Sequence, residues 1–400
     1  MSNYIYKCFN CKKEFSSEII EKEFHYLCPE CGEAENNKPI KGVLTIEYDY
    51  QDLMKKLSKE EFLNLNPGKF WLYPDFWPLN FKNYSDEQLI KLSLPSDQFL
   101  KYNVNENEFW ILDDTRNPTL SYKDRASSLV ALKALELGIN EIAAASTGNA
   151  GSSLAGICAR LGLKARIFTP KNIPSAKRIQ IETYGAELTI VDGDYDKAFD
   201  VCLEESKKNN WYNRNTAYNP LTIEGKKSAA YDIFISSKVN IPDVIIVPVG
   251  DGVIISGVYK GFNELFSLGW IDKLPKIIAV QSTGSDALVR YLNTGKFEYK
   301  PANTIADSIS AGAPRNLYMA ANAVKESNGF AIAVPDEEIL SAQKEFIKHT
   351  GILCEPSCAS VYAVYKKLIA QNKISSTEKP LLMITGNGLK DIESLKKITS

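Results

Sequence analysis

A lysine at the start of an expected helix is the side chain whose position is best suited to chemistry. Lys123 follows a turn at 113–122 and begins an Ala- and Leu-rich stretch. The positive end of a helix dipole disfavours a cation, which shifts the amine toward its neutral, nucleophilic form. A neutral lysine amine can form a Schiff base with a carbonyl compound. Because the chain has 47 Lys and Arg residues, the alternative is an ordinary solvated charge.

A small polar turn follows an expected strand at 141–145. It reads Ser146-Thr147-Gly148-Asn149 and leads into a second expected helix. Its backbone amides, hydroxyls and carboxamide suit a carboxylate or a phosphate, because the glycine permits close approach. The alternative is an ordinary helix N-cap, where Ser, Thr and Asn are preferred.

Two further turns contain glycine and directly follow apolar runs. The first is Gly250-Asp251-Gly252-Val253-Ile254, whose amides could surround a phosphate. The second runs from 385 to 391 near the C-terminus. A lone Gly-x-Gly turn is common in α/β proteins, so neither turn identifies a ligand by itself.

Four cysteines near the start of the chain form two C-x-x-C pairs, Cys8 with Cys11 and Cys28 with Cys31. This spacing predicts a zinc ribbon, in which two hairpins each supply two thiolates to a tetrahedral Zn²⁺. The metal then holds together a module too small for a core of its own. The alternative is four thiols on the same hairpins without metal.

A scaffold of parallel strands would bring these turns together. From about residue 116, short apolar runs alternate with amphipathic stretches, as in βαβ units on sheets covered on both faces. Ligands in such folds bind at the carboxyl ends of strands, next to helix N-termini. The expected strands are 141–145, 165–169, 187–191, 244–249, 276–281, 331–334 and 381–385.

Length and charge restrict the class of protein. The 400 residues suffice for two domains, or for one large domain with a lobe. A formal charge of −2 provides no overall basic field for nucleic acid or anionic lipid. No apolar run approaches the roughly 18 residues that span a bilayer, and the N-terminus lacks a signal-peptide pattern. We therefore expect a cytoplasmic protein with no nucleic-acid or membrane partner.

Together and in this order, the four turns resemble segments of the threonine synthases, which are pyridoxal-phosphate enzymes of fold type II. The family's cofactor-lysine segment is similar to 117–126, its substrate-carboxylate loop to 146–149 and its terminal signature to 385–391. Many members also carry an N-terminal cysteine ribbon, so the resemblance covers nearly the whole chain.

The resemblance implies a fold like that of the tryptophan synthase β subunit. Two doubly wound α/β domains would enclose the active site, preceded by a zinc-ribbon-like segment at 1–41. The large domain would comprise 42–117 and 221–400, and the small, mobile domain 118–220. Closure of the small domain would keep bulk water away from reactive intermediates.

The resemblance also implies roles for single residues. Lys123 would hold pyridoxal phosphate as a Schiff base and then move protons as general base and acid. Asn149 would hydrogen-bond the cofactor's 3′-oxygen, and the Thr385 hydroxyl would face its pyridine nitrogen. The cofactor's phosphate would be held at the glycine turn by Gly250, Asp251, Gly252, Val253 and Ile254. The substrate would be bound by Ser146, Thr147, Gly148 and Lys177. The ribbon allows a structural zinc ion on Cys8, Cys11, Cys28 and Cys31.

By this resemblance, the reaction is γ-elimination of phosphate from O-phosphohomoserine, followed by addition of water at the β-carbon to give threonine. The partner is then a small phosphorylated amino acid, and a homodimer is one option for the assembly. The nearest alternative is β-replacement on O-phosphoserine, as in cysteate synthase, or a related amino-acid lyase. An alternative of another class is a catalytically inactive zinc-ribbon binding protein, which the intact Lys123, Asn149 and Thr385 disfavour.

Two positions depart from the family pattern near the expected phosphate groups. Thr222 stands where members commonly carry an arginine that pairs with the substrate phosphate, and a hydroxyl cannot supply bidentate pairing. Either Lys226 or Arg315 has taken over, or the leaving group differs. Asp251 replaces an asparagine of the phosphate loop, and we expect its carboxylate to cap the helix that begins near Val253.

Overall fold

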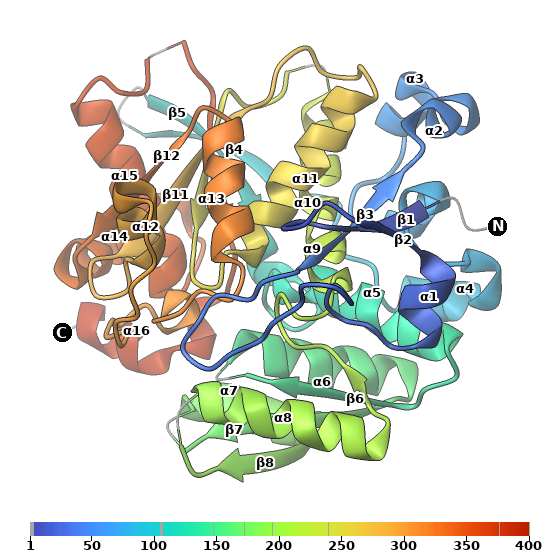
Figure 1. Cartoon of the computed structure of the whole chain (residues 1–400). Coiled ribbons are helices and arrows are strands. Elements are labelled where there is room, and N and C mark those ends of the chain that lie inside the picture. The colour runs from blue at the N-terminus through green and yellow to red at the C-terminus, as the bar shows by residue number, and fades with distance from the viewer. Residues whose placement is uncertain are drawn as a thin grey trace.

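Two sheets of mainly parallel strands form the body of the protein, and a small antiparallel sheet precedes them (Figure 1). This architecture confirms the expected α/β class. No helix in the described part of the chain is long and apolar enough to cross a membrane. The computed structural model describes residues 4–399 except 105–106, 147, 172, 194, 239 and 376.

The larger sheet has the strand order β12-β11-β10-β13-β5-β4 in the described residues. Its strands are β4 (Phe99–Val104), β5 (Asn107–Asp113), β10 (Val244–Pro248), β11 (Lys276–Ser282), β12 (Phe330–Val334) and β13 (Pro380–Ile384). Neighbours are parallel except β4 and β5, which form an antiparallel pair. The sequence predicted β10 to β13 to within about one residue but missed β4 and β5. β4 is a partly exposed edge strand without a long apolar run, so it lacks the pattern of a buried strand.

Helices cover both faces of this sheet. On one side lie α11 (Val253–Ser267) and α13 (Leu317–Glu326), and on the other α14 (Asp336–Thr350) and α15 (Pro356–Ala370). Ile245 and Val247 share a core with α11 and α13, whereas Val244 and Ile246 share a separate core with α14 and α15. Every residue of β10 is therefore buried, as expected for a strand with two covered faces.

The smaller sheet has the order β8-β7-β6-β9 in the described residues, and its strands are all parallel. Its strands are β6 (Glu141–Ala145), β7 (Lys164–Pro170), β8 (Glu187–Val191) and β9 (Tyr212–Asn213). Its helices are α6 (Asn149–Leu161), α7 (Ser175–Thr183) and α8 (Tyr195–Asn209). Two further helices, α5 (Lys123–Glu136) and α9 (Leu221–Lys226), lie between the two sheets in Figure 1, and α10 (Ser228–Ser237) lies beside α11.

The N-terminal sheet has the order β2-β1-β3 and is joined to the body by buried polar contacts. The Tyr48 hydroxyl donates to Glu224 Oε1 at 2.7 Å, and Lys260 Nζ donates to the Ile46 carbonyl at 2.6 Å. The N-terminal segment therefore packs as part of the molecule. Its elements are β1 (Tyr4–Cys8), β2 (Glu14–Ser16), α1 (Ser17–Lys22) and β3 (Leu44–Tyr48).

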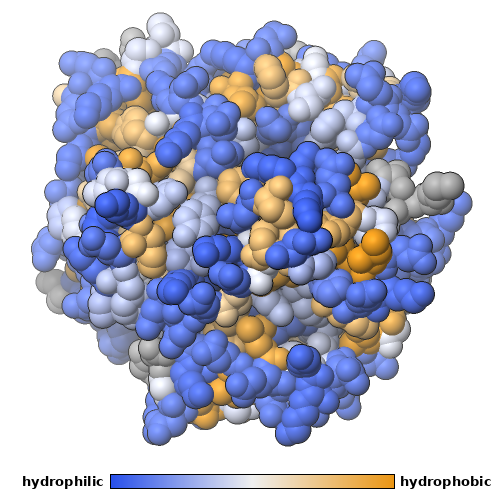
Figure 2. All heavy atoms as spheres, viewed as in Figure 1, coloured by the Kyte–Doolittle hydropathy of each residue, from blue (hydrophilic) through white to orange (hydrophobic). Residues whose placement is uncertain are grey.

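The remaining helices are short and surround this framework. They are α2 (Tyr50–Lys56), α3 (Lys59–Leu63), α4 (Asp86–Ile90), α12 (Ala287–Thr294) and α16 (Ile392–Thr399). Figure 2 shows that hydrophilic residues cover most of the face in view and that hydrophobic ones are scattered in small groups. Such scattering is ordinary for a protein surface.

Candidate active site

A cavity of about 600 Å³ opens at the carboxyl ends of β6, β10 and β13. Lys123, which directly follows the first turn, and residues of the other three turns contribute to its wall. The predicted residues that line it are Lys123, Ser146, Gly148, Asn149, Gly250, Asp251, Gly252, Val253, Ile254 and Thr385. Thr147 lies outside the described residues, and Lys177 lies just behind the wall, where its side chain passes close to Gly148.

Lys123 is the first residue of α5, as predicted. The C-terminal signature fixes the approach to it, since the Tyr122 amide donates to the Thr385 carbonyl at 2.9 Å and Ser121 forms a β-bridge with Gly386. Burial, and then the charge of Arg214, lower the pKa of Lys123 to about 8. The cavity therefore contains a lysine whose neutral form is much more accessible than that of a solvated lysine.

The two residues after Lys123 hold this helix start in place. Asp124 accepts hydrogen bonds from the Thr119 amide and the Ser153 hydroxyl, both at 2.7 Å, so it ties α5 to α6. Arg125 is fully buried and its guanidinium pairs with Asp114 at 2.9 Å. These contacts explain why a charged Lys-Asp-Arg run begins a buried helix.

Asn149 is the first residue of α6 and presents an open acceptor. Its Nδ2 donates to Ser308 Oγ at 3.0 Å and to Glu355 Oε2 at 2.7 Å. Its Oδ1 is buried and has no hydrogen-bond partner within the described chain. Because buried polar atoms are almost always paired, this oxygen marks a place for a donor on a ligand.

The glycine turn after β10 leaves the start of α11 open to an anion. Gly252 has φ of 83°, and a Cβ there would lie 3.0 Å from the Asn316 carbonyl, so a glycine is needed. No side chain caps α11, and its first amides are available to a ligand in the cavity. The expected cap by Asp251 is wrong: its carboxylate accepts from the Arg315 amide at 3.2 Å, because the segment before α13 packs against the turn.

Thr385 directly follows β13 and lines the cavity, and a cysteine positions it. The Thr385 and Gly386 amides each donate to Cys358 Sγ at 3.2 Å. Cys358 is fully buried, and no motif in the sequence indicated this contact. Its sulfur is a weak acceptor that fixes the backbone of the terminal signature.

Lys177, on a helix of the smaller sheet, forms ion pairs with two carboxylates from the part of the chain that builds the larger sheet. These carboxylates were not identified from the sequence. Lys177 Nζ lies 2.7 Å from Asp307 Oδ2 and 3.1 Å from Glu355 Oε1. Lys177 and Glu355 are almost completely buried. Glu355 directly precedes Pro356 and Ser357 at the start of α15, and this short Glu-Pro-Ser sequence is the only local feature that could have pointed to it. The expected contact of Lys177 with the substrate stays a prediction. The ammonium of Lys177 already forms ion pairs with Asp307 and Glu355 in this structure.

The position of Thr222 does not favour contact with a ligand. It is fully buried, its hydroxyl donates to the Asn219 carbonyl at 2.7 Å, and it is not among the residues that line the cavity. Arg315 is also turned away, because its guanidinium bonds the Glu35 and Lys38 carbonyls and pairs with Asp196. Of the two cations expected to replace the missing arginine, only Lys226 lines the cavity.

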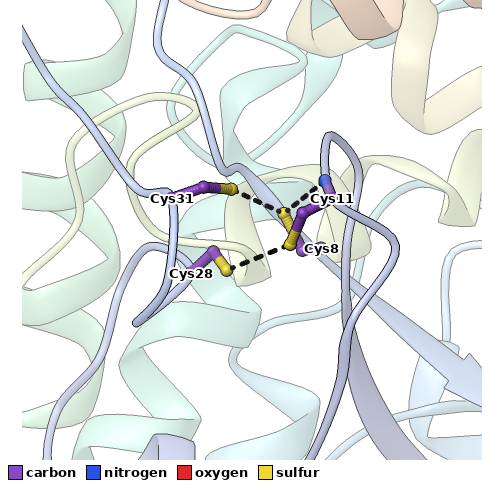
Figure 3. A group of neighbouring side chains, drawn as sticks. All are labelled: Cys8, Cys11, Cys28 and Cys31. Atoms are coloured by element: carbon purple, nitrogen blue, oxygen red, sulfur yellow. Dashed lines mark hydrogen bonds between the residues drawn. The ribbon is translucent and has the colours of Figure 1, made fainter.

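The four N-terminal cysteines form one cluster, as their spacing predicted (Figure 3). Their sulfur atoms all lie within 4.8 Å of one another, with Cys8 and Cys31 3.5 Å apart and Cys11 and Cys28 3.7 Å apart. Four thiolates at about 2.3 Å from one Zn²⁺ have sulfur atoms about 3.8 Å apart. The cluster therefore has the size of a tetrahedral zinc site.

Substitution of Cys31 by serine is expected to remove bound zinc and loosen the N-terminal segment. The purified wild-type protein should contain roughly one zinc per chain, since four thiolates complete a structural site. Metal analysis and limited proteolysis of residues before β3 measure the two effects. Cys158→Ala is the matched control, because Cys158 is buried far along the chain from the cluster. Equal metal content in the wild type and Cys31→Ser would contradict the site.

A family model and the similar curated proteins all indicate the same family of enzymes. A family model described as pyridoxal-phosphate dependent enzyme matches residues 93–386. The threonine synthase of Methanocaldococcus jannaschii is 34% identical over 395 residues, which is 96% of this chain and 92% of that protein. That of Methanosarcina acetivorans is 31% identical, covering 98% of this chain and 93% of that protein.

Solved structures agree on the fold alone. Maize serine racemase superposes with a TM-score of 0.65 at 20% identity, covering 76% of this chain and 91% of that one. A processed threonine deaminase isoform from Solanum lycopersicum gives a TM-score of 0.63 at 21% identity, covering 92% and 97%.

Proposed function

The chain belongs to the threonine synthase family of pyridoxal-phosphate-dependent enzymes, and we propose that it eliminates phosphate from O-phosphohomoserine and adds water to form threonine. Pyridoxal phosphate is the cofactor of this family. The observation that carries the proposal is the convergence of Lys123 and the three other turns on one cavity. The threonine synthase relatives that cover nearly the full chain favour this substrate over the alternatives.

The cavity residues fit the cofactor, and we assign them as follows. Lys123 would hold it covalently, and the open amides of α11 would hold its phosphate. The unpaired Asn149 Oδ1 would accept a hydrogen bond from the cofactor's 3′-hydroxyl. The Thr385 hydroxyl at the end of β13 would face the ring nitrogen. When bound, the cofactor supplies an electron sink for bonds next to the substrate's amino group.

Lys123 is also our candidate for the proton transfers. Once the substrate's amine has replaced it, its Nζ would take protons from and return protons to the substrate carbons. A group with a pKa near 8 can both accept and donate a proton near neutral pH. Neither His25 nor His349 lines the cavity. We therefore assign the acid and base roles to one amine.

The contacts between the two sheets would keep water out of the cavity. Asn149 and Lys177 belong to helices of the smaller sheet, whereas Glu355 directly precedes α15 of the larger sheet. We propose that 118–220 moves as a small domain and that these contacts form when it closes. Excluding water protects reactive intermediates and strengthens the electrostatic interactions inside.

A product assay tests the proposed substrate. The purified enzyme is incubated with O-phosphohomoserine, and in parallel with O-phosphoserine plus sulfite, and amino acids and inorganic phosphate are measured. We expect equal amounts of threonine and phosphate in the first reaction and no cysteate in the second. Cysteate without threonine would replace the proposal with the β-replacement reaction.

Cofactor uptake by the stripped protein is expected to accelerate as the pH rises through about 8, the pKa of Lys123. Only the neutral amine attacks an aldehyde, and its fraction grows as pH passes the pKa. An ordinary lysine would place this rise near pH 10.4, roughly two units higher. Rapid-mixing absorbance over a pH series measures the midpoint, and a midpoint near the ordinary value would contradict the assigned environment.

A further inference from the structure

Lys226 is a buried cation that forms no ion pair with another residue of the described chain. Its side chain is fully buried at the end of α9, yet it lines the cavity. Its Nζ has no hydrogen-bond partner among the described residues. An unpaired buried ammonium is costly and is retained where it has a function or a ligand.

The charge of a second buried cation, Arg214, acts on Lys226. Arg214 is also completely buried, and its Nη2 has no partner within the described residues. Its Nη1 donates to Thr216 Oγ1 at 3.1 Å, and Thr216 lines the cavity. Burial, followed by the charges of Arg214 and Lys123, lowers the pKa of Lys226 well below its usual value, and Asp251 opposes this shift. An anion placed here would act against these causes and raise the pKa of Lys226.

The surrounding backbone selects the type of anion. Lys226 packs against the second turn of α11, where a Cβ on Gly257 would lie 2.6 Å from Lys226 Cβ. The same cavity wall contains the uncapped start of α11. An ammonium beside open helix amides matches a phosphate, which offers several acceptor oxygens and up to two negative charges.

We propose that Lys226, supported by Arg214, pairs with a phosphate monoester in this cavity. Two phosphates reach the cavity under the proposed function, on which this inference rests: that of the cofactor and that of the substrate. Both present the same chemistry to the amine. Lys226 would therefore determine either how tightly the cofactor is held or which leaving group is accepted.

Lys226→Gln separates the two sources. If the cofactor's phosphate is the partner, pyridoxal phosphate should bind about 10- to 100-fold more weakly while pyridoxal binds unchanged, as expected for one lost charge-assisted hydrogen bond. If the substrate's phosphate is the partner, cofactor affinity stays constant and the KM for O-phosphohomoserine rises by a similar factor. Inhibition by inorganic phosphate should weaken in parallel.

Lys171→Gln is the matched control. Lys171 lines the same cavity, but its ammonium is largely exposed and pairs with Asp192 at 2.9 Å. Lys226→Gln should fold normally, because it removes an uncompensated buried charge. As an independent measurement on the wild type, inorganic phosphate should raise the unfolding temperature of the cofactor-stripped protein above that in chloride of equal ionic strength.

Unchanged cofactor affinity, KM and phosphate inhibition in Lys226→Gln would overturn the inference. So would equal weakening of pyridoxal and pyridoxal phosphate, since that pattern indicates general damage to the site. These results differ from failure of the proposed function, in which the wild-type enzyme itself makes no threonine from O-phosphohomoserine.

Discussion

Lys123→Ala is expected to lose both threonine formation and the visible absorbance of the bound cofactor. The substitution removes the amine that we assign to covalent attachment and to proton transfer. Loss of a general acid or base alone costs about 10²- to 10⁴-fold in rate, so the combined loss should leave no measurable turnover. Absorbance of the purified protein and a threonine assay measure the two effects.

The matched control is Lys171→Ala, which removes an amine at the exposed edge of the same cavity. It should keep the absorbance and the activity. Borohydride reduction of the wild-type enzyme and peptide mapping then locate the attachment. Added mass at Lys226, the other cavity lysine with a lowered pKa, would contradict the assignment of Lys123.

Lys177→Met is expected to lower the free energy of unfolding by about 3–5 kcal/mol, because it leaves a buried Glu355 without its cation. The two groups lie 3.1 Å apart with side chains 1% and 2% exposed. Chemical denaturation measures the loss. Arg178→Met is the matched control: Arg178 is the next residue on α7 and pairs with Glu182 at the surface, so it should change stability by less than about 1 kcal/mol. Equal stability of the two variants would show that the buried pair contributes little.

The same pair predicts a dependence of stability on pH. Burial alone would raise the pKa of Glu355, but Lys177 and Lys390 lower it below its usual value. A folded-state pKa below the unfolded value of about 4.3 stabilises the native state above that pH, and the gain is lost as pH falls through the folded pKa. Lys177→Met should therefore show a smaller loss of stability on acidification than the wild type. An identical acid profile for the two proteins would count against this coupling.

The starts of the three helices around the site followed from sequence alone. Lys123, Asn149 and Val253 each come after a turn whose composition marks the end of regular structure, and the structure begins α5, α6 and α11 at these residues. Apolar runs predicted the parallel strands β10 to β13 nearly to the residue, because a strand covered on both faces cannot tolerate polar positions, but the buried strand β5 was missed. The four-cysteine cluster followed from spacing for a similar reason, since two hairpins with C-x-x-C pairs can close on one metal.

The tertiary structure decided the pairing of charged groups. Glu355 meets Lys177 and Asn149 across more than 170 positions of sequence, and no local pattern specifies such contacts. Asp251 was expected to cap its own helix, but the neighbouring segment offers the Arg315 amide instead. Arg315 and Lys226 were equivalent cations in the sequence, yet only Lys226 reaches the cavity. Turn chemistry and hydrophobic periodicity depend on residues a few positions apart, so they can be recognised from the sequence. The partner of a buried charge depends on which distant elements pack beside it, so only the tertiary structure determines it.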